Sequence, residues 1–220
     1  MTLVSSALDS GLGTLDRQPW QILSTPPVSG EANMAYDRTT LEAVSAGRQL
    51  PTLRFFRFQE PTVTYGRFQK RDLVSRQVPP GWSLVQRPTG GGIVFHRNDL
   101  CLSLAWTKGY RPLPQTISGC YQWIHEVICR VLVRCVPATM ASCKDCATSL
   151  APFDDRHCFK EPVVHDLLSG GQKITGGALW RQRDVLLYQG SIQKTLPPEF
   201  ETTLWQAFAE AFENPLELIP

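Results

Sequence analysis

Cysteine is the residue type here best suited to nucleophilic chemistry, and Cys158 stands in the segment His157-Cys158-Phe159-Lys160-Glu161-Pro162. A cysteine attacks only as its thiolate, and a nearby cation lowers the thiol pKa from its usual value of about 8.5. Lys173, fifteen residues further on, is such a cation if the fold brings the two side chains together. The competing interpretation is a small, inert, buried thiol, which is the usual fate of a cysteine.

Lys173 itself lies between two glycine pairs, in Gly170-Gly171-Gln172-Lys173-Ile174-Thr175-Gly176-Gly177-Ala178. Small residues on both sides leave room for a bound chain and bring the backbone close to it. We therefore expect this stretch to line a substrate site. The alternative is a solvated lysine in a hairpin turn, since lysine is rarely buried without a role.

A third motif is the glycine run of Arg87-Pro88-Thr89-Gly90-Gly91-Gly92-Ile93-Val94-Phe95-His96. Its backbone can approach a ligand closely, and exposed N–H groups there suit a carboxylate, carbonyl or phosphate. Arg87 adds a positive fork beside the run. On the glycine triplet alone, a plain hairpin turn is the favoured interpretation. A phosphate-binding P-loop is excluded, because no Lys-Ser/Thr pair follows.

Cys143 and Cys146 form a lone CxxC. Together with His157 and Cys158 they supply four potential zinc ligands. A second CxxC and a firm zinc-ribbon spacing are both missing, so we expect no bound metal. A redox role for this CxxC is even less favoured, because the motif does not follow a predicted strand and does not begin a predicted helix.

The overall composition narrows the classes of partner and compartment. The net charge is +2 and the isoelectric point is near 8.2, which is too mild for a nucleic-acid surface but suits acidic protein partners. No segment is apolar enough to predict a membrane span, and the N-terminus lacks the features of a signal peptide. We expect a cytoplasmic protein whose seven cysteines are mostly reduced.

The periodicity of apolar residues predicts one α+β domain, with a mixed or antiparallel sheet packed against helices. A helix is expected over residues 31–46, and two more where apolar residues recur at helical spacing over 124–135 and 204–212. Short strands are expected at residues 53–58, 62–65, 101–106, 163–168 and 184–192, and on both sides of the glycine run. Residues 1–17 are expected to be loosely held, and 18–220 to form the domain.

Five blocks, in order along the chain, match motifs of one superfamily. They are residues 33–37, 53–58, 87–96, 173–178 and 186–192. The chain thus resembles the biotin/lipoate ligase and octanoyltransferase superfamily over about residues 30–195. The resemblance implies the catalytic-domain fold of biotin and lipoate protein ligases.

One transferase branch of that superfamily carries a Cys-Phe-x-x-Pro block about fifteen residues before the motif lysine, as Cys158 stands before Lys173 here. The resemblance therefore implies that Cys158 and Lys173 are catalytic. The residues that it implies for substrate binding are Arg87, Gly90, Gly91, Gly92, His96, Gly176 and Gly177. The chain departs from the superfamily pattern at Gln86, at Cys101-Leu102-Ser103 and at Tyr188-Gln189-Gly190.

This branch implies transfer of an octanoyl or lipoyl group from acyl carrier protein, through a cysteine thioester, to a lysine of a lipoyl-domain protein. The acceptor is of the dehydrogenase E2 or glycine cleavage H type, and no cofactor is needed. The main alternative is a lipoate-protein ligase that uses ATP and magnesium, with Lys173 and Arg87 binding carboxylate and phosphate. A non-catalytic or biotin-handling relative is the second alternative.

Overall fold

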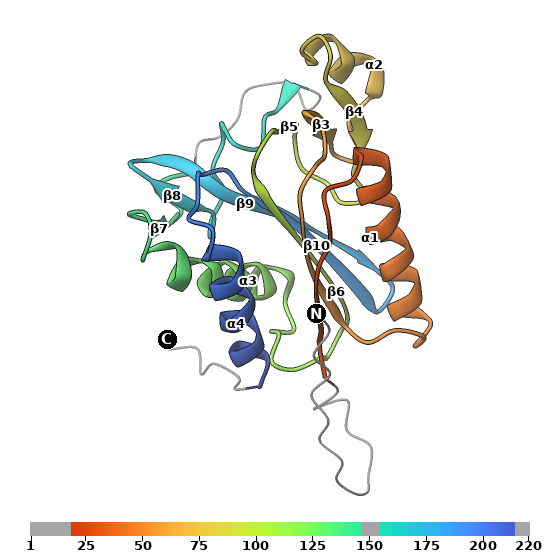
Figure 1. Ribbon diagram of the computed structural model, residues 1–220, viewed down its shortest axis with the longest axis vertical. Helices are drawn as coiled ribbons and strands as arrows, with labels where there is room; N and C mark the ends of the chain where they lie inside the picture. The colour runs from red at the N-terminus through yellow and green to blue at the C-terminus, as the bar shows by residue number, and fades with distance from the viewer. Residues whose placement is uncertain (1–18, 147–154, 214–220) are drawn as a thin grey trace, which may run out of the picture.

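A seven-stranded sheet forms the centre of the fold (Figure 1), in a computed structural model that describes residues 19–146 and 155–213. Its strands are β1 (Gln21–Ser24), β2 (Thr52–Phe56), β6 (Leu100–Thr107), β10 (Val185–Ile192), β9 (Gln172–Gln182), β8 (Leu167–Ser169) and β7 (Thr139–Met140), in that order across the sheet. Neighbouring strands are antiparallel except β1 and β2, which are parallel. The prediction of a mixed, mostly antiparallel sheet is confirmed. The segment 1–17, expected to be loosely held, lies outside the described residues.

A second, three-stranded sheet has the order β4-β3-β5. Strand β3 (Thr62–Tyr65) is parallel to β4 (Ser83–Gln86) and antiparallel to β5 (Val94–His96). The glycine run joins β4 to β5, which lie on opposite sides of β3, so the run is a crossing loop rather than a hairpin turn. This loop passes so close to the end of β3 that a Cβ on Gly66 would overlap the carbonyl oxygen of Gly91.

Helices cover both faces of the large sheet (Figure 1). On one face α3 (Ile117–Leu132) and α4 (Phe200–Glu213) pack together, and their buried side chains join the main core. On the other face lies α1 (Gly30–Ser45), whose Leu41 and Val44 contact a separate cluster. Strand β10 contributes side chains to both faces of the sheet, because successive side chains of a strand point in opposite directions. Leu186 belongs to the main core, and Leu187 belongs to the cluster that α1 covers.

The predicted helices are found, with shifted ends. The helix expected at residues 31–46 spans Gly30–Ser45 and is capped by the Ser29 hydroxyl, which accepts from Ala32 N at 3.2 Å. The apolar stripe of α3 is buried as expected, but Cys135, its last predicted member, lies beyond the helix and is exposed.

The strand expected at residues 163–168 begins only at Leu167, because His165 has a φ of 73° and interrupts the extended run. A very short helix, α2 (Arg71–Val74), and a 3₁₀ turn (Ser75–Gln77) connect β3 to β4.

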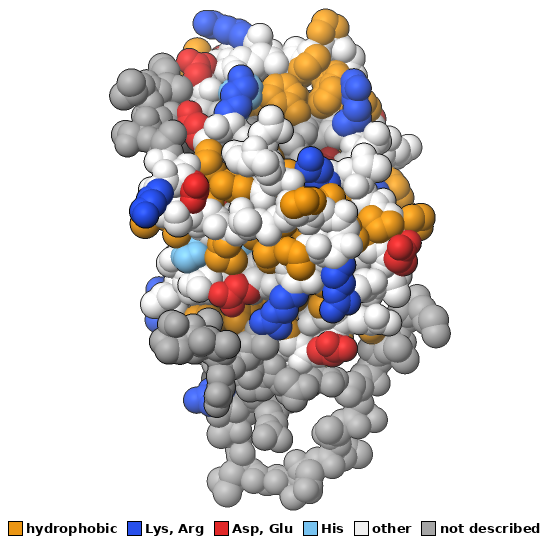
Figure 2. All heavy atoms as spheres, turned by 90° about the vertical axis from the view of Figure 1, so that its left-hand side faces the viewer, with side chains coloured by type: hydrophobic (Ala, Val, Ile, Leu, Met, Phe, Trp, Pro, Cys, Tyr) orange, Lys and Arg blue, Asp and Glu red, His pale blue; other side chains and the backbone are white. Residues whose placement is uncertain are grey.

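Over the described residues, none of the helices combines the length and the apolar character that crossing a bilayer requires. Acidic and basic side chains are interspersed with small hydrophobic areas on the side of the molecule seen in Figure 2.

Candidate active site

The glycine loop is held in shape by the buried guanidinium of Arg87. This group donates to the Gly90 carbonyl at 3.0 Å and to the Gly92 carbonyl at 2.7 Å. Its other terminal nitrogen donates to the Thr64 hydroxyl at 2.6 Å. Burial lowers the pKa of Arg87, although neighbouring cysteines oppose that effect. Arg87 also lines the pocket described below, and its hydrogen bonds organise the loop.

Cys158 reaches the glycine loop because its segment pairs with the start of the strand that follows the loop. Ile93 N donates to the Arg156 carbonyl at 2.7 Å, and Cys158 N donates to the Ile93 carbonyl at 2.9 Å. The sulfur then lies 3.3 Å from Gly92 N, whose N–H points at it. Gly91 has a φ of 87°, and a Cβ there would lie 3.1 Å from the sulfur and 3.3 Å from an Arg87 nitrogen. Glycine at 91 therefore lets sulfur and guanidinium flank the same backbone.

Lys173 lies on β9, and its side chain is buried beside Asp166. The ammonium nitrogen is 2.7 Å from Asp166 Oδ2 and 5.4 Å from the centre of the Phe159 ring. Within the described parts of the chain, no hydrogen bond joins this ammonium to the Cys158 sulfur. Cys158 and its neighbour Phe159 line the pocket described below, and the Phe159 ring connects them to the Lys173 ammonium.

The two glycines after Lys173 make room for larger side chains. A Cβ at Gly176 would overlap Lys173 Cε and lie 2.6 Å from its Nζ. A Cβ at Gly177 would lie 2.6 Å from the Tyr188 hydroxyl oxygen. The glycine pair was expected to let the backbone approach a ligand. In the structure, it also lets the lysine fold back across its own strand.

A buried polar layer supports the Lys173–Asp166 pair from the α3 side. The Tyr121 hydroxyl donates to Asp166 and accepts from Gly177 N at 2.9 Å. His125 Nε2 lies 2.7 Å from the Tyr188 hydroxyl, and its Nδ1 lies 2.7 Å from the His165 carbonyl. Burial lowers the pKa of His125 to about 3, so this imidazole is neutral at physiological pH. The N–H of Gly177, a residue expected to bind substrate, donates to Tyr121.

A second buried polar cluster surrounds His96. The imidazole lies between Asp99 Oδ2, at 2.6 Å from Nδ1, and the Thr64 hydroxyl, at 2.8 Å from Nε2. Ser191 and Cys101 also donate to Asp99. Burial alone would raise the pKa of Asp99, but the charge of His96 and these hydrogen bonds outweigh it and lower the pKa to about 2. Through Thr64, the cluster connects to Arg87 and hence to the glycine loop.

A pocket lies between these groups. Its walls are mainly apolar where they are formed by Met34, Phe56, Phe58 and Val94. The reactive or polar residues at its surface are Thr64, Arg87, His96, Cys101, Cys158, Gln189 and Ser191, and Phe159, Gly176, Gly177, Ala178 and Gly190 complete it. A thiol at the surface of an apolar pocket can receive a chain with a reactive carbonyl at its end.

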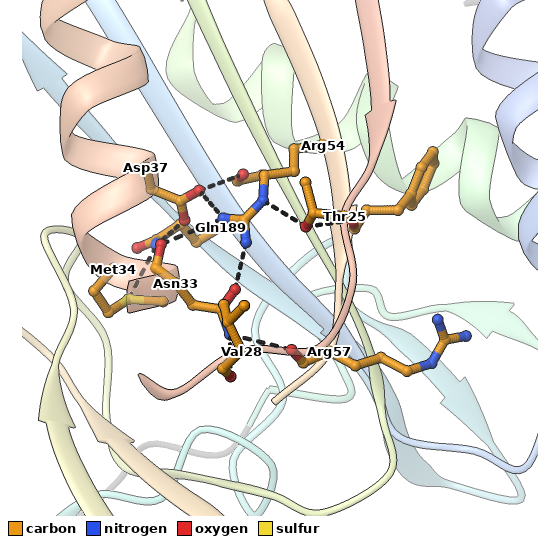
Figure 3. A network of polar contacts seen from close by, with 10 residues as sticks. Thr25, Val28, Asn33, Met34, Asp37, Arg54, Arg57 and Gln189 are labelled. Carbon is orange, nitrogen blue, oxygen red and sulfur yellow. Dashed lines mark hydrogen bonds and ion pairs between the residues drawn. The ribbon is translucent and has the colours of Figure 1, made fainter. Parts of the chain in front are cut away.

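A network centred on Asp37 connects α1 to β2 and β10 (Figure 3). Asp37 pairs with Arg54 at 2.9 Å and accepts from the Gln189 amide at 2.6 Å. Burial raises the pKa of Asp37, and Arg54 opposes that rise. The Gln189 carbonyl accepts from the Thr89 hydroxyl at 2.8 Å, in the loop itself. Buried charges of this kind fix the position of the loop relative to the sheet.

The structure therefore brings most of the predicted site residues together. Cys158, Arg87, His96, Gly176 and Gly177 all line the pocket, Gly91 and Gly92 contact the sulfur, and Lys173 lies behind Gly176. Sequence reasoning missed the buried partners Asp166, Tyr121, Asp99, Thr64 and Gln189. Asp166 had a signal, because a carboxylate inside an apolar run is rarely buried without a partner.

The four side chains considered as zinc ligands do not gather. Cys146 contacts the Ser142 carbonyl, His157 contacts Gln77, and Cys158 faces Gly92. Among the described residues, the one group of three potential ligand atoms within 4.8 Å is His96, Asp99 and Cys101. Mutual hydrogen bonds already account for the arrangement of that group.

The fold agrees with that of known proteins. The family described as the lipoyl protein ligase A/B catalytic domain matches residues 29–199. The chain belongs to this family, within the biotin and lipoate protein ligase superfamily.

Relatives of the chain include octanoyltransferases. The chain is 32% identical to octanoyltransferase LipM of Kyrpidia tusciae over 190 residues, which cover 83% of this chain and 68% of that protein. It is 29% identical to LipM of Oceanobacillus iheyensis, over 90% of this chain and 72% of that protein.

Solved structures share the fold at lower identity. Protein Ta0514 of T. acidophilum with bound lipoic acid has a TM-score of 0.67 at 19% identity, covering 89% of this chain and 87% of the other. A lipoate-protein ligase A bound with ATP has a TM-score of 0.65, also at 19% identity, with coverage of 89% and 86%.

Proposed function

We propose that this protein is a cytoplasmic enzyme that transfers a medium-chain acyl group, above all octanoyl, from acyl carrier protein to a lysine of a lipoyl-domain protein. Between the two transfers the acyl group is held as a thioester on Cys158. The observation that supports this most is the position of the Cys158 sulfur, at the wall of an apolar pocket and 3.3 Å from a backbone N–H. The similarity to octanoyltransferases at about 30% identity points the same way.

The reaction proceeds in two covalent steps. The Cys158 thiolate attacks the carbonyl of the donor thioester, the bond to the donor sulfur breaks, and the released donor thiolate takes up a proton. The neutral amine of the acceptor lysine then attacks the acyl-enzyme. An amide forms, the amine proton is lost to solvent or base, and Cys158 leaves as a thiolate. A thioester is already activated, so the scheme needs no ATP.

Backbone and charge around the sulfur suit this chemistry. The Gly92 N–H is the donor nearest to the sulfur, so it is positioned to stabilise the oxyanion that forms beside it. Arg87 and Lys173 are the two buried cations of the site, and both favour the thiolate and the oxyanion electrostatically. Because Asp166 pairs with Lys173, that lysine acts as a fixed positive group rather than as a base.

The apolar pocket receives the acyl chain. Met34, Phe56, Phe58 and Val94 offer a surface without charge, which favours a hydrocarbon chain over a short polar one. The Asp99–His96–Thr64 hydrogen-bond chain keeps Arg87 and the loop in place during transfer.

Substitution of Cys158 tests the proposal against the ligase alternative. We expect Cys158→Ala to abolish transfer from octanoyl-acyl carrier protein to a lipoyl domain, while Cys135→Ser, at an exposed cysteine outside the site, retains it. A Cys158→Ala variant that still attaches free lipoate or octanoate with ATP would show adenylate chemistry instead and would overturn the proposal.

A further inference from the structure

A basic segment lies beside the proposed active site. Residues 66–77 hold four basic side chains, Arg67, Lys70, Arg71 and Arg76, and one acidic side chain, Asp72. All five are exposed. The segment therefore carries a net charge of +3 within twelve residues.

Both ends of this segment contact residues that neighbour Cys158. At its start, Gly66 packs against Gly90 and Gly91 of the glycine loop, and the next residue of that loop, Gly92, points its N–H at the sulfur. At its end, Gln77 Oε1 lies 2.8 Å from Nε2 of His157, the residue preceding Cys158. Between these ends, α2 lies at the tip of the molecule, above the small sheet (Figure 1). The charge is therefore presented at the rim of the site.

An exposed aromatic side chain accompanies the charge. Phe68 is 69% exposed, more than any other large hydrophobic side chain in the described part of the chain, and its ring lies close to Gly90. The Arg67 guanidinium lies 5.2 Å from the centre of the Phe68 ring and 4.3 Å from that of Trp180. Trp180 is on β9, two residues after Ala178 of the pocket wall. Arginine next to an exposed aromatic ring is a common composition of protein-binding surfaces.

We propose that residues 66–77 form the docking surface for the donor, an acidic acyl carrier protein, and not for the acceptor. This inference rests on the proposed function. The donor's thioester arm is joined to its protein through a phosphodiester, and arginine side chains bind phosphate and carboxylate well. The acceptor instead presents a lysine amine, which is protonated at neutral pH and is repelled by a cationic rim. Opposite charge also speeds the encounter of donor and enzyme.

Charge reversal tests the docking surface. The double variant Arg71→Glu/Arg76→Glu is compared with Arg130→Glu/Arg134→Glu, which reverses two exposed arginines at the C-terminal end of α3. For each protein, intact-mass spectrometry follows the rate of Cys158 acylation by octanoyl-acyl carrier protein and by S-octanoyl pantetheine, which has neither protein nor phosphate. We expect the first variant to react about tenfold more slowly with the carrier protein, with a weaker salt dependence, and normally with the small thioester.

The outcomes separate the two proposals. The docking proposal is overturned if Arg71→Glu/Arg76→Glu reacts with the carrier protein at the unchanged rate. It is also overturned if this variant loses as much rate with the small thioester as with the carrier protein, or if both double variants lose the same rate. None of these outcomes contradicts the proposed chemistry of Cys158. If only the second step slows, from isolated acyl-enzyme to a lipoyl domain, the segment serves the acceptor and the donor assignment is wrong. If the unchanged protein forms no adduct with either donor, the proposed function falls, and the docking proposal with it.

Discussion

The Lys173 ammonium nitrogen lies 2.7 Å from Asp166 Oδ2, with 3% of the lysine side chain and none of the aspartate side chain exposed. Two opposite charges taken out of water stabilise each other, and each is costly without the other. The pair also explains how a lysine remains charged behind the pocket wall. The account of Lys173 as a fixed cation depends on this relationship.

Removal of the Asp166 charge should therefore destabilise the folded protein. We expect Asp166→Asn to lower the free energy of unfolding by about 3–5 kcal/mol, because it leaves a buried ammonium unpaired. The double variant Lys173→Met/Asp166→Asn should cost less than the two single changes together. Urea denaturation of all four proteins measures this coupling, and simple additivity would contradict the buried pair.

The space above Gly176 is a second point of sensitivity. A Cβ there would overlap Lys173, so Gly176→Ala should displace the ammonium and slow Cys158 acylation by about a hundredfold. At Gly90 a Cβ would meet only Phe68, at 4.0 Å, so Gly90→Ala should keep a much larger share of the rate. Single-turnover kinetics of the two variants provide the comparison. Equal losses would mean that Lys173 is not displaced, or that its position is unimportant.

Acid sensitivity should come partly from His125. Burial lowers its pKa in the folded protein to about 3, whereas the unfolded chain binds the proton near pH 6.5. Stability is thus lost as pH falls below 6.5, by about 2 kcal/mol at pH 5. In His125→Gln this loss is absent, so the difference in unfolding free energy between wild type and variant should shrink from pH 7 to pH 5. A difference that stays constant over this range would argue against a neutral buried imidazole.

Asp99 should also make the protein less stable in acid, but through the loss of a favourable negative charge rather than through the gain of an unfavourable positive one. Its pKa is lowered from 3.8 to about 2 in the folded state, so its ionised form adds about 2 kcal/mol of stability above pH 4. That contribution disappears as pH falls from about 4 to about 2. Wild type should therefore exceed Asp99→Asn in stability at pH 5, and the two should converge near pH 2. Denaturant titrations at both pH values check this, and a gap that widens in acid would refute it.

Local periodicity made much of the fold predictable. The apolar stripe of α3 recurs every three or four residues, so Ile124, Val127 and Ile128 could be placed in the core from the sequence. Strand ends were less predictable. The apolar run at residues 163–168 predicts one strand, but the positive φ of His165 breaks the extended backbone, so the strand begins only at Leu167. The crossing path of the glycine loop depends on the order of β4, β3 and β5, which no local pattern contains.

Sequence motifs predicted several residues that lie at the pocket, but not the contacts that these residues make. The sequence motifs identified Cys158, Lys173 and the glycine loop, but the contact between Cys158 and Gly92 arises from pairing of His157 with Ile93, residues far apart in the chain. The expected direct partnership of Cys158 and Lys173 was an inference from charge alone. The ammonium pairs with Asp166, whose position depends on the turn before β8.

The most direct test of the account is the mass of the protein after incubation with octanoyl-acyl carrier protein in the absence of ATP. We predict a single octanoyl adduct that maps to Cys158 and disappears when a lipoyl domain is added, as the octanoyl group moves to the acceptor lysine. An adduct on another cysteine, or no adduct together with ATP-dependent attachment of free acid, would contradict the covalent role of Cys158.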